Sequence, residues 1–132
     1  ERIGLAWMGG RSKFRHGPLD VDFTAGKNHP VGRNFDKVHF YDESYWQPYG
    51  DPGRVNLLAT CIEEGAEQPL FWTREHNGGR VFVSIPGHYS WTFDDPLFRI
   101  LLLRGMAWTA KEPVDRFNEL ALPGARVRAT AD

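Results

Sequence analysis

The sequence lacks the features that mark several easily recognised classes of protein. It contains one cysteine, Cys61, so a framework of disulfides is impossible. Its 16 basic and 17 acidic side chains leave a formal charge of −1, which gives no electrostatic attraction toward nucleic acid or an anionic membrane. The aliphatic run Ile100–Leu103 is far shorter than the roughly 20 residues of a membrane-spanning helix. We therefore expect neither nucleic acid nor a membrane as a partner.

Motifs that identify common enzyme sites are missing as well. The sequence has no H-E-x-x-H or paired C-x-x-C motif for zinc, and no G-x-G-x-x-G or Walker loop for nucleotide phosphates. It also has no G-x-S-x-G nucleophile elbow. The chain opens Glu1-Arg2 without a leader, which either was removed or was never included. We therefore expect a soluble protein that is either cytoplasmic or secreted.

What the sequence does have is a heavy aromatic load and many residues that turn the chain. Its 132 residues are the size of one domain or part of one, and a hydrophobic content of 41% argues against disorder. Five Trp, nine Phe and four Tyr supply core area, but aromatic side chains also line sugar and small-molecule sites. Fourteen Gly and nine Pro favour short strands over long helices.

Alternating or β-branched segments predict about five strands. They lie at 19–23, 37–41, 55–59, 68–73 and 80–85. The last segment, Arg80–Ile85, has the strongest β-propensity and is expected in the interior of the sheet. Asn77-Gly78-Gly79 before it predicts a turn. Ile3–Met8 starts without a capping signal and is interpreted as the end of an element that begins upstream.

One helix is predicted over Asp95–Ala110. Asp95 is an N-cap candidate, and Pro96 occupies the first helical position, where its missing N–H costs nothing. Apolar residues cover most of the helix surface, so we expect it to pack across a sheet. One helix is too few for an ordinary doubly wound domain. The fold is therefore either α+β or one half of a larger α/β domain.

Ionisable residues follow a strand or a glycine turn at four places. These are His16, His29, the Asp42-Glu43 pair and His88. Side chains at strand ends converge on ligands in open α/β sheets, and imidazole with carboxylate can bind a divalent metal or act as an acid–base pair. Adjacent side chains of a strand point to opposite sides, so we do not expect Asp42 and Glu43 in one site. Each histidine also has a structural interpretation, such as ordering its own loop, and Cys61 is interpreted as a small buried hydrophobe.

Several short motifs follow one another between about Gly9 and Ala110. They are Phe14-x-His16, His29-Pro30, Asp42-Glu43-x-Tyr45, Pro69-x-x-Trp72, Gly79-Arg80-Val81-Phe82, Gly87-His88 and Gly105-Met106-Ala107-Trp108. Each motif by itself is weak, but the ordered set is more specific. This order resembles the trehalose-utilisation (ThuA-like) family.

This resemblance implies a class I glutamine amidotransferase-like fold, a flavodoxin-like α/β sandwich of three layers that is incomplete in this chain. Residues 1–113 would be the C-terminal portion of a ThuA-like domain, and residues 114–132 an irregular tail or the start of a linker. Either an upstream half or another copy of the chain would supply the remaining strands. The nucleophile of the glutaminase triad would lie upstream of Glu1, so we do not expect glutamine amidotransferase activity.

The resemblance also implies a role in bacterial sugar metabolism, with a keto-glycoside or disaccharide as the expected ligand. It points to His88 and Glu43 as acid–base groups, and to His16, His88 and Glu43 as the ligands if a divalent metal such as zinc is bound. Substrate contacts are expected from a wider set. Its members are His29, Asp42, Tyr45, Trp46 and Trp91. The alternative is a non-catalytic module that binds carbohydrate or acts as a scaffold.

Overall fold

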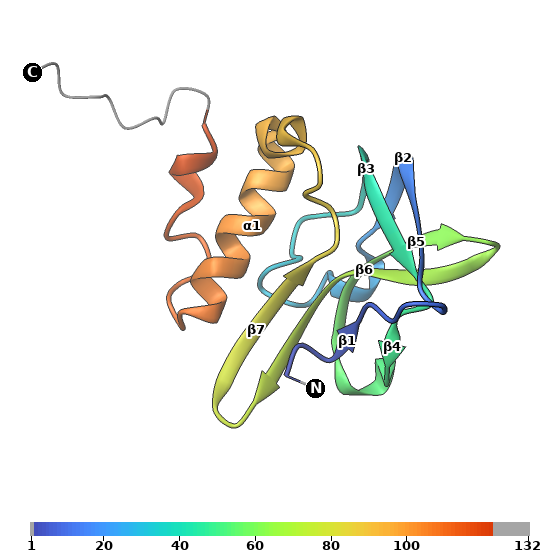
Figure 1. Cartoon of the computed structure of the whole chain (residues 1–132). Helices are drawn as coiled ribbons and strands as arrows, with labels where there is room; N and C mark the ends of the chain where they lie inside the picture. Colours follow the sequence, from blue (N-terminus) through green and yellow to red (C-terminus); the bar gives the residue numbers. More distant parts are fainter. Residues whose placement is uncertain (1, 123–132) are drawn as a thin grey trace, which may run out of the picture.

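The computed structural model describes residues 2–122 and builds them around a five-stranded sheet with one long helix (Figure 1). The strand order is β3-β2-β5-β6-β7, and every pair is antiparallel. The strands are β2 (Lys13–Asp22), β3 (Lys37–Trp46), β5 (Asn56–Glu63), β6 (Ala66–His76) and β7 (Gly79–Ser84). A second sheet pairs β1 (Leu5–Ala6) with β4 (Tyr49–Gly50). Single turns of 3₁₀ helix are η1 (Thr24–Gly26), η2 (Pro52–Arg54), η3 (Ser90–Asp94) and η4 (Asn118–Ala121).

The β2–β3 hairpin is longer than the sequence pattern predicts. Leu19 opposite Phe40 faces the core, as the alternation of apolar residues requires. The ladder continues through the pairs Gly17–Asp42 and His16–Glu43 to the end of both strands. The prediction that His16, Asp42 and Glu43 follow strand ends is therefore wrong. These residues lie inside the strands, because the in-and-out alternation of side chains continues past the apolar positions with polar ones.

The strands β5, β6 and β7 form a meander joined by tight turns. Asn77 and Gly78 both have positive φ, 50° and 76°, which is the backbone of a two-residue hairpin turn. The turn and the three strands predicted in this region are confirmed. The prediction that Arg80–Ile85 lies in the interior of the sheet is wrong for the described residues. Here β7 pairs with β6 alone and forms an edge, and strong β-propensity does not specify how many neighbours a strand has.

The sheet curls because its two parts are joined at one point. Strands β2 and β5 share a single paired position, Asp22 opposite Thr60. In Figure 1 the β2–β3 hairpin therefore turns away from the β6–β7 hairpin. This opening leaves room for the segment between β7 and the helix to reach the free edge of β3, where η3 packs.

The helix α1 (Pro96–Thr109) confirms the helix prediction. Asp95 caps it by accepting hydrogen bonds from the backbone N–H groups of Leu97 and Phe98, at 2.8 and 3.2 Å. The helix packs on β7, and the absence of a side chain at Gly105 allows the Phe82 ring to lie against its backbone. The core lies between this helix and the sheet. Its largest fully buried members include Phe23, Leu58, Leu70, Phe71, Phe98 and Leu101.

The α/β class is confirmed at the level of a curled five-stranded sheet with one helix. The parallel strands and three layers of a flavodoxin-like sandwich are not seen in residues 2–122, where all strand pairs are antiparallel. The predicted tail begins with turns and η4, which packs on α1, and residues 123–132 lie outside the described part. Within the described part, no helix has the length and apolar character needed to cross a bilayer.

Candidate functional site

The candidate site is centred on the carboxylate of Glu43, on β3. Its Oε2 accepts a hydrogen bond of 2.7 Å from the Tyr45 hydroxyl and lies 3.1 Å from Nδ1 of His88. Its Oε1 lies 3.6 Å from Nε2 of His16, the residue directly opposite on β2. The two imidazole rings meet edge to face, with centroids 4.8 Å apart. One carboxylate thus holds two histidines that are far apart in the sequence.

Asp42 fixes the loop that carries His88. It lies on the opposite face of β3 and is fully buried, at 0% exposure. Its carboxylate accepts hydrogen bonds from the N–H groups of Gly87 and His88, at 3.1 and 3.0 Å, and from the Thr92 hydroxyl. Gly87 has φ of 135°, a conformation that other residues rarely adopt. Asp42 is thus a positioning residue, and its burial leaves it no access to a substrate.

The expectation that Asp42 and Glu43 do not share one site agrees with this geometry, since Asp42 is buried and holds the loop backbone. The side chains do point to opposite faces of the strand. Both nevertheless act on His88, since β3 is an edge strand and the loop wraps around that edge. Asp42 holds the backbone of His88, while Glu43 contacts its ring.

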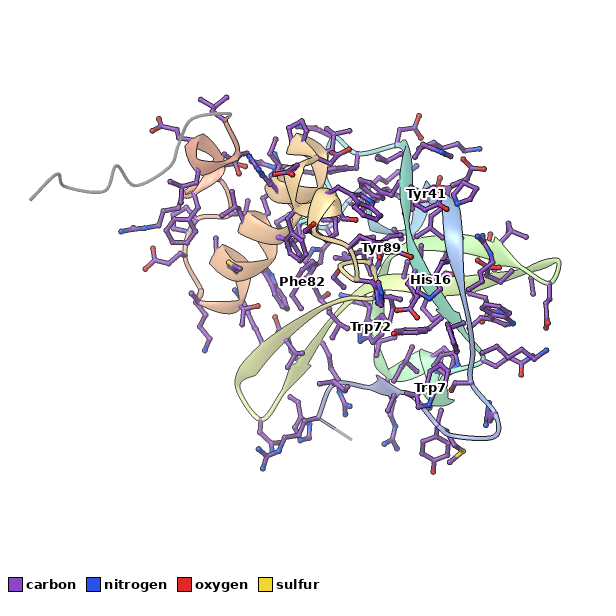
Figure 2. All side chains as sticks on the ribbon, turned by 45° about the horizontal axis from the view of Figure 1, so that its top comes forward. Trp7, His16, Tyr41, Trp72, Phe82 and Tyr89 are labelled. Atoms are coloured by element: carbon purple, nitrogen blue, oxygen red, sulfur yellow. The ribbon has the colours of Figure 1, made fainter. Side chains whose placement is uncertain are left out.

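A row of aromatic side chains lies over this cluster, which we call the aromatic band. Its members are Trp7, Phe14, Tyr41, Tyr89 and Trp91. The band is continuous through His16, whose ring lies 5.8 Å from that of Phe14 and 5.6 Å from that of Tyr89. All members except Tyr89 are more than half exposed. Figure 2 shows Trp7, His16, Tyr89 and Tyr41 following one another along this side of the molecule.

Hydrogen bonds hold the band in a defined shape. The Tyr89 hydroxyl lies 2.8 Å from Nδ1 of His16, and its ring stacks on Trp91 with centroids 4.1 Å apart and planes inclined by 12°. The indole N–H of Trp91 donates to the backbone carbonyl of Tyr41, at 3.1 Å. The stacked pair is thereby fixed to β3, and it presents a flat apolar surface beside polar groups.

The arrangement around His88 suits proton transfer. A carboxylate beside Nδ1 favours the tautomer that carries its hydrogen on Nδ1 and leaves a lone pair on Nε2. Within the described residues Nε2 has no partner, and 47% of the His88 side chain is exposed. Burial, with the hydrogen bond to Glu43, raises the pKa of Tyr45 to about 12. Tyr45 therefore remains a hydrogen-bond donor to Glu43 at neutral pH.

A second buried carboxylate braces the hairpin from the core side. Glu63 of β5 pairs with Arg15, whose Nε and terminal nitrogen each lie 2.8 Å from a carboxylate oxygen, and accepts a 2.6 Å hydrogen bond from the Ser44 hydroxyl. This network ties both strands of the hairpin to β5. Cys61 lies beside it, 3% exposed, and burial raises the pKa of its thiol to about 12. Cys61 is thus a buried small side chain, as predicted from the sequence.

The remaining predicted site residues lie in different places. Trp91 belongs to the aromatic band, while Trp46 is buried in the wall of a neighbouring cavity. His29 is not in the cluster: its Nδ1 accepts from the Val31 N–H at 3.2 Å, and its ring meets Trp108 edge to face. It lines a separate pocket of about 470 Å³. His29 orders its own turn, which is the structural interpretation the sequence allowed.

The three expected metal ligands meet, yet not as a coordination site. His16, Glu43 and His88 are neighbours, but the part of the chain that the structure describes contains no group of three or more His, Cys, Asp or Glu residues that could hold a metal ion. The oxygens of Glu43 face Tyr45 and the two imidazoles instead.

Sequence reasoning missed Tyr89, Phe14, Tyr41 and Trp7. The signal for two of them was present: Phe14 and His16 alternate on β2, and Tyr41, Glu43 and Tyr45 alternate on β3. Period-two spacing places each series on one face, and a correct hairpin register brings the two series together. No local signal marks Tyr89 or Trp7, since both reach the site by long-range packing.

The fold and the cluster define a mixed α/β domain with a polar site beneath exposed aromatic side chains. The family model for trehalose utilisation, ThuA, matches residues 4–109, and the chain belongs to this family. The resemblance noted in the sequence is thereby confirmed. The description of the family indicates a role in carbohydrate metabolism.

A solved structure supports the same relationship. The chain is similar to a ThuA-like protein from Parabacteroides merdae, with 26% sequence identity and a TM-score of 0.63. The similarity covers 82% of this chain and 47% of that protein, so this chain spans about half the length of its relative. No curated protein shows significant similarity to the chain.

Proposed function

We propose that this chain forms the carbohydrate-binding and acid–base part of an enzyme that acts on a keto-glycoside or keto-disaccharide. The observation that carries the proposal is the carboxylate of Glu43, only 7% exposed, between two imidazoles and directly below the aromatic band. Membership of the ThuA family supports a sugar as the ligand.

The aromatic band offers the kind of surface that sugars recognise. The C–H groups of a pyranose form apolar faces that pack on aromatic rings, while its hydroxyls need a few fixed polar partners. The stacked rings of Tyr89 and Trp91 supply a flat platform, and the adjacent imidazoles of His16 and His88 supply polar groups. A sugar lying on the band would therefore place its hydroxyls or keto group near Glu43.

With a keto-sugar as the substrate, the cluster could catalyse a defined reaction. A carbonyl at carbon 3 makes the hydrogen on carbon 2 acidic, so Nε2 of His88 can remove that proton as a general base. The electron pair of the broken C–H bond forms a double bond between carbons 1 and 2, and the glycosidic C–O bond breaks. The leaving oxygen then takes up a proton. Glu43 orients the His88 ring and stabilises the imidazolium formed when Nε2 is protonated.

Turnover of a 3-keto-glucoside by the intact protein tests this proposal. We expect His88→Ala and Glu43→Gln each to lower kcat at least about 100-fold, the usual contribution of a positioned acid–base group. The matched control is His76→Ala, at an exposed position on β6 away from the cluster. Activity that is unchanged in His88→Ala, or lost equally in His76→Ala, would contradict the assignment.

A non-catalytic carbohydrate-binding module is the second candidate. The observation that favours it is the stacked Tyr89–Trp91 pair with its exposed Trp91 ring, which could bind a sugar face without any proton transfer. The two candidates differ in one measurement. Binding of a keto-glycoside that survives Glu43→Gln, is lost in Trp91→Ala, and is accompanied by no turnover would favour the module.

A further inference from the structure

An apolar cavity of about 160 Å³ adjoins the Glu43 cluster. It lies between the β1 segment, the end of β3, the middle of β6 and the end of β7. Its walls include Ala6, Trp7, Tyr45, Trp46, Trp72 and Ile85.

Several polar groups in the cavity wall are already occupied. The indole N–H of Trp72 donates to the Ile3 carbonyl at 2.8 Å. The Ser12 hydroxyl donates to the Gln47 carbonyl at 3.1 Å and accepts from the Met8 N–H at 3.0 Å. The Tyr45 hydroxyl points to Glu43. A ligand in this cavity would therefore meet mainly carbon atoms, which favours an apolar group over a sugar.

The cavity and the cluster share side chains. The ring of Tyr45 lines the cavity while its hydroxyl bonds to Glu43, and Trp7 contacts Phe14 of the aromatic band while it lines the same cavity. Ile85 lies on the wall three residues before His88. The cavity thus shares a wall with the cluster, and an apolar group attached to a ligand at His88 would lie close to it.

We propose that this cavity is the subsite for an apolar group, about the size of one aromatic ring, that is attached to the sugar. The size fits, because a dry apolar cavity of about 150 Å³ is sufficient to bind benzene. The inference rests on the proposed function and extends it. The sugar occupies the aromatic band and the His–Glu–His cluster, and the aglycone occupies the cavity, so the glycosidic bond lies between them.

The test compares two ligands that carry the same sugar. Binding of phenyl β-glucoside and methyl β-glucoside to the intact protein is measured by nuclear magnetic resonance titration or calorimetry. We expect the phenyl glucoside to bind about tenfold or more tightly, because the ring leaves water for an apolar wall. Nuclear Overhauser contacts from the phenyl protons to tryptophan ring protons should accompany this difference.

A pair of matched variants locates the effect. Ala6 is exposed and lines the cavity, so Ala6→Leu adds bulk at its wall without replacing a core residue. We expect it to reduce the affinity for phenyl glucoside to that for methyl glucoside, and to leave methyl glucoside binding unchanged. The control is Ala66→Leu, the same change at an exposed position of β6 outside the cavity, which should retain the phenyl preference.

The outcomes separate this inference from the function on which it rests. If methyl glucoside binds but phenyl glucoside binds no more tightly, or if Ala6→Leu retains the phenyl preference, the subsite is refuted and the proposed function stands. If neither glucoside nor a keto-glucoside binds, the proposed function fails and the subsite fails with it.

Discussion

Two parts of this molecule share one apolar core but differ in the polar contacts that they contain. The helix side consists of β5, β6, β7 and α1, whose contacts are made by fully buried apolar residues such as Leu70, Phe71 and Phe98. The site side consists of the β2–β3 hairpin and residues 86–92. Beside core residues such as Leu19 and Phe40, its interior contains buried polar side chains with hydrogen-bond partners, such as Asp42 and Ser44.

The difference shows how the chain combines stability with a defined site. Hydrophobic burial has no preferred direction and scales with area, so the apolar core stabilises the fold without fixing each side chain by a hydrogen bond. Hydrogen bonds to buried carboxylates contribute less net stability, but their loss leaves donors unsatisfied and shifts whole loops. The geometry of the site side therefore depends on individual hydrogen bonds, and a site for acid–base chemistry needs side chains that are positioned in this way.

The largest effect should come from a cavity on the helix side. Phe98 is 0% exposed, and its ring lies 5.8 Å from Phe40 and 5.3 Å from Phe93. We expect Phe98→Ala to lower the free energy of unfolding by about 3–5 kcal/mol, measured by urea titration. The control is Leu97→Ala, the neighbouring helix position at 44% exposure, which should cost less than about 1 kcal/mol. Equal losses would contradict burial in the core as the reason for the effect.

On the site side, the greatest loss should follow Asp42→Asn. An amide in place of the carboxylate keeps the shape but replaces one acceptor oxygen with a donor, so the N–H groups of Gly87 and His88 lose part of their partner. We expect a loss of about 2–3 kcal/mol together with greater mobility of residues 87–92. Hydrogen exchange of the two amides measures the second effect. Asp20→Asn, at an exposed position of β2, should change the free energy of unfolding by no more than about 0.5 kcal/mol and should leave the exchange of the two amides unchanged.

An overpacking variant tests the contact between α1 and β7. A Cβ atom at Gly105 would lie 2.3 Å from the Phe82 ring, so Gly105→Ala should displace that ring. We expect a net cost of about 1–2 kcal/mol, since strain exceeds the gain in helix propensity. Gly9→Ala, where nothing lies within 4 Å of the added atom, should be nearly neutral. A stabilised Gly105→Ala protein would mean that the ring moves freely at this edge.

The smallest effect concerns pH. Burial, with the nearby positive charge of Arg80, lowers the pKa of His29 below its usual 6.5. Protonation then favours the unfolded chain, so the stability contributed by neutral His29 is fully present above about pH 6.5 and is lost as the pH falls from there through the lowered pKa of the folded protein. The free energy of unfolding, measured by urea titration, should differ less between pH 7.5 and pH 5.0 for His29→Gln than for the unmodified protein. His76→Gln, at an exposed position, should keep the original difference.

Local patterns in the sequence were sufficient to predict where most of the longer strands and the helix lie. Alternation identified the core-facing part of the β2–β3 hairpin, and Asp95-Pro96 marked the start of α1. Asn77-Gly78 marked a hairpin turn. These signals work because backbone sterics, capping and side-chain period act over a few residues. His16, Glu43 and His88 became candidates in another way, through the resemblance to the ThuA-like family and their interpreted positions at strand or turn ends, and the strand-end interpretation was wrong for His16 and Glu43.

Only the tertiary structure decided how those pieces combine. Strand order placed β3 at an edge, and this let the loop of residues 86–92 wrap around it so that Asp42 and Glu43 both act on His88. The register of the hairpin placed His16 opposite Glu43, and long-range packing added Tyr89. Local pattern does not determine these features, because pairing and register depend on contacts between residues that lie tens of positions apart. The sequence thus determined which residues can do chemistry, and the folded chain decided which of them meet.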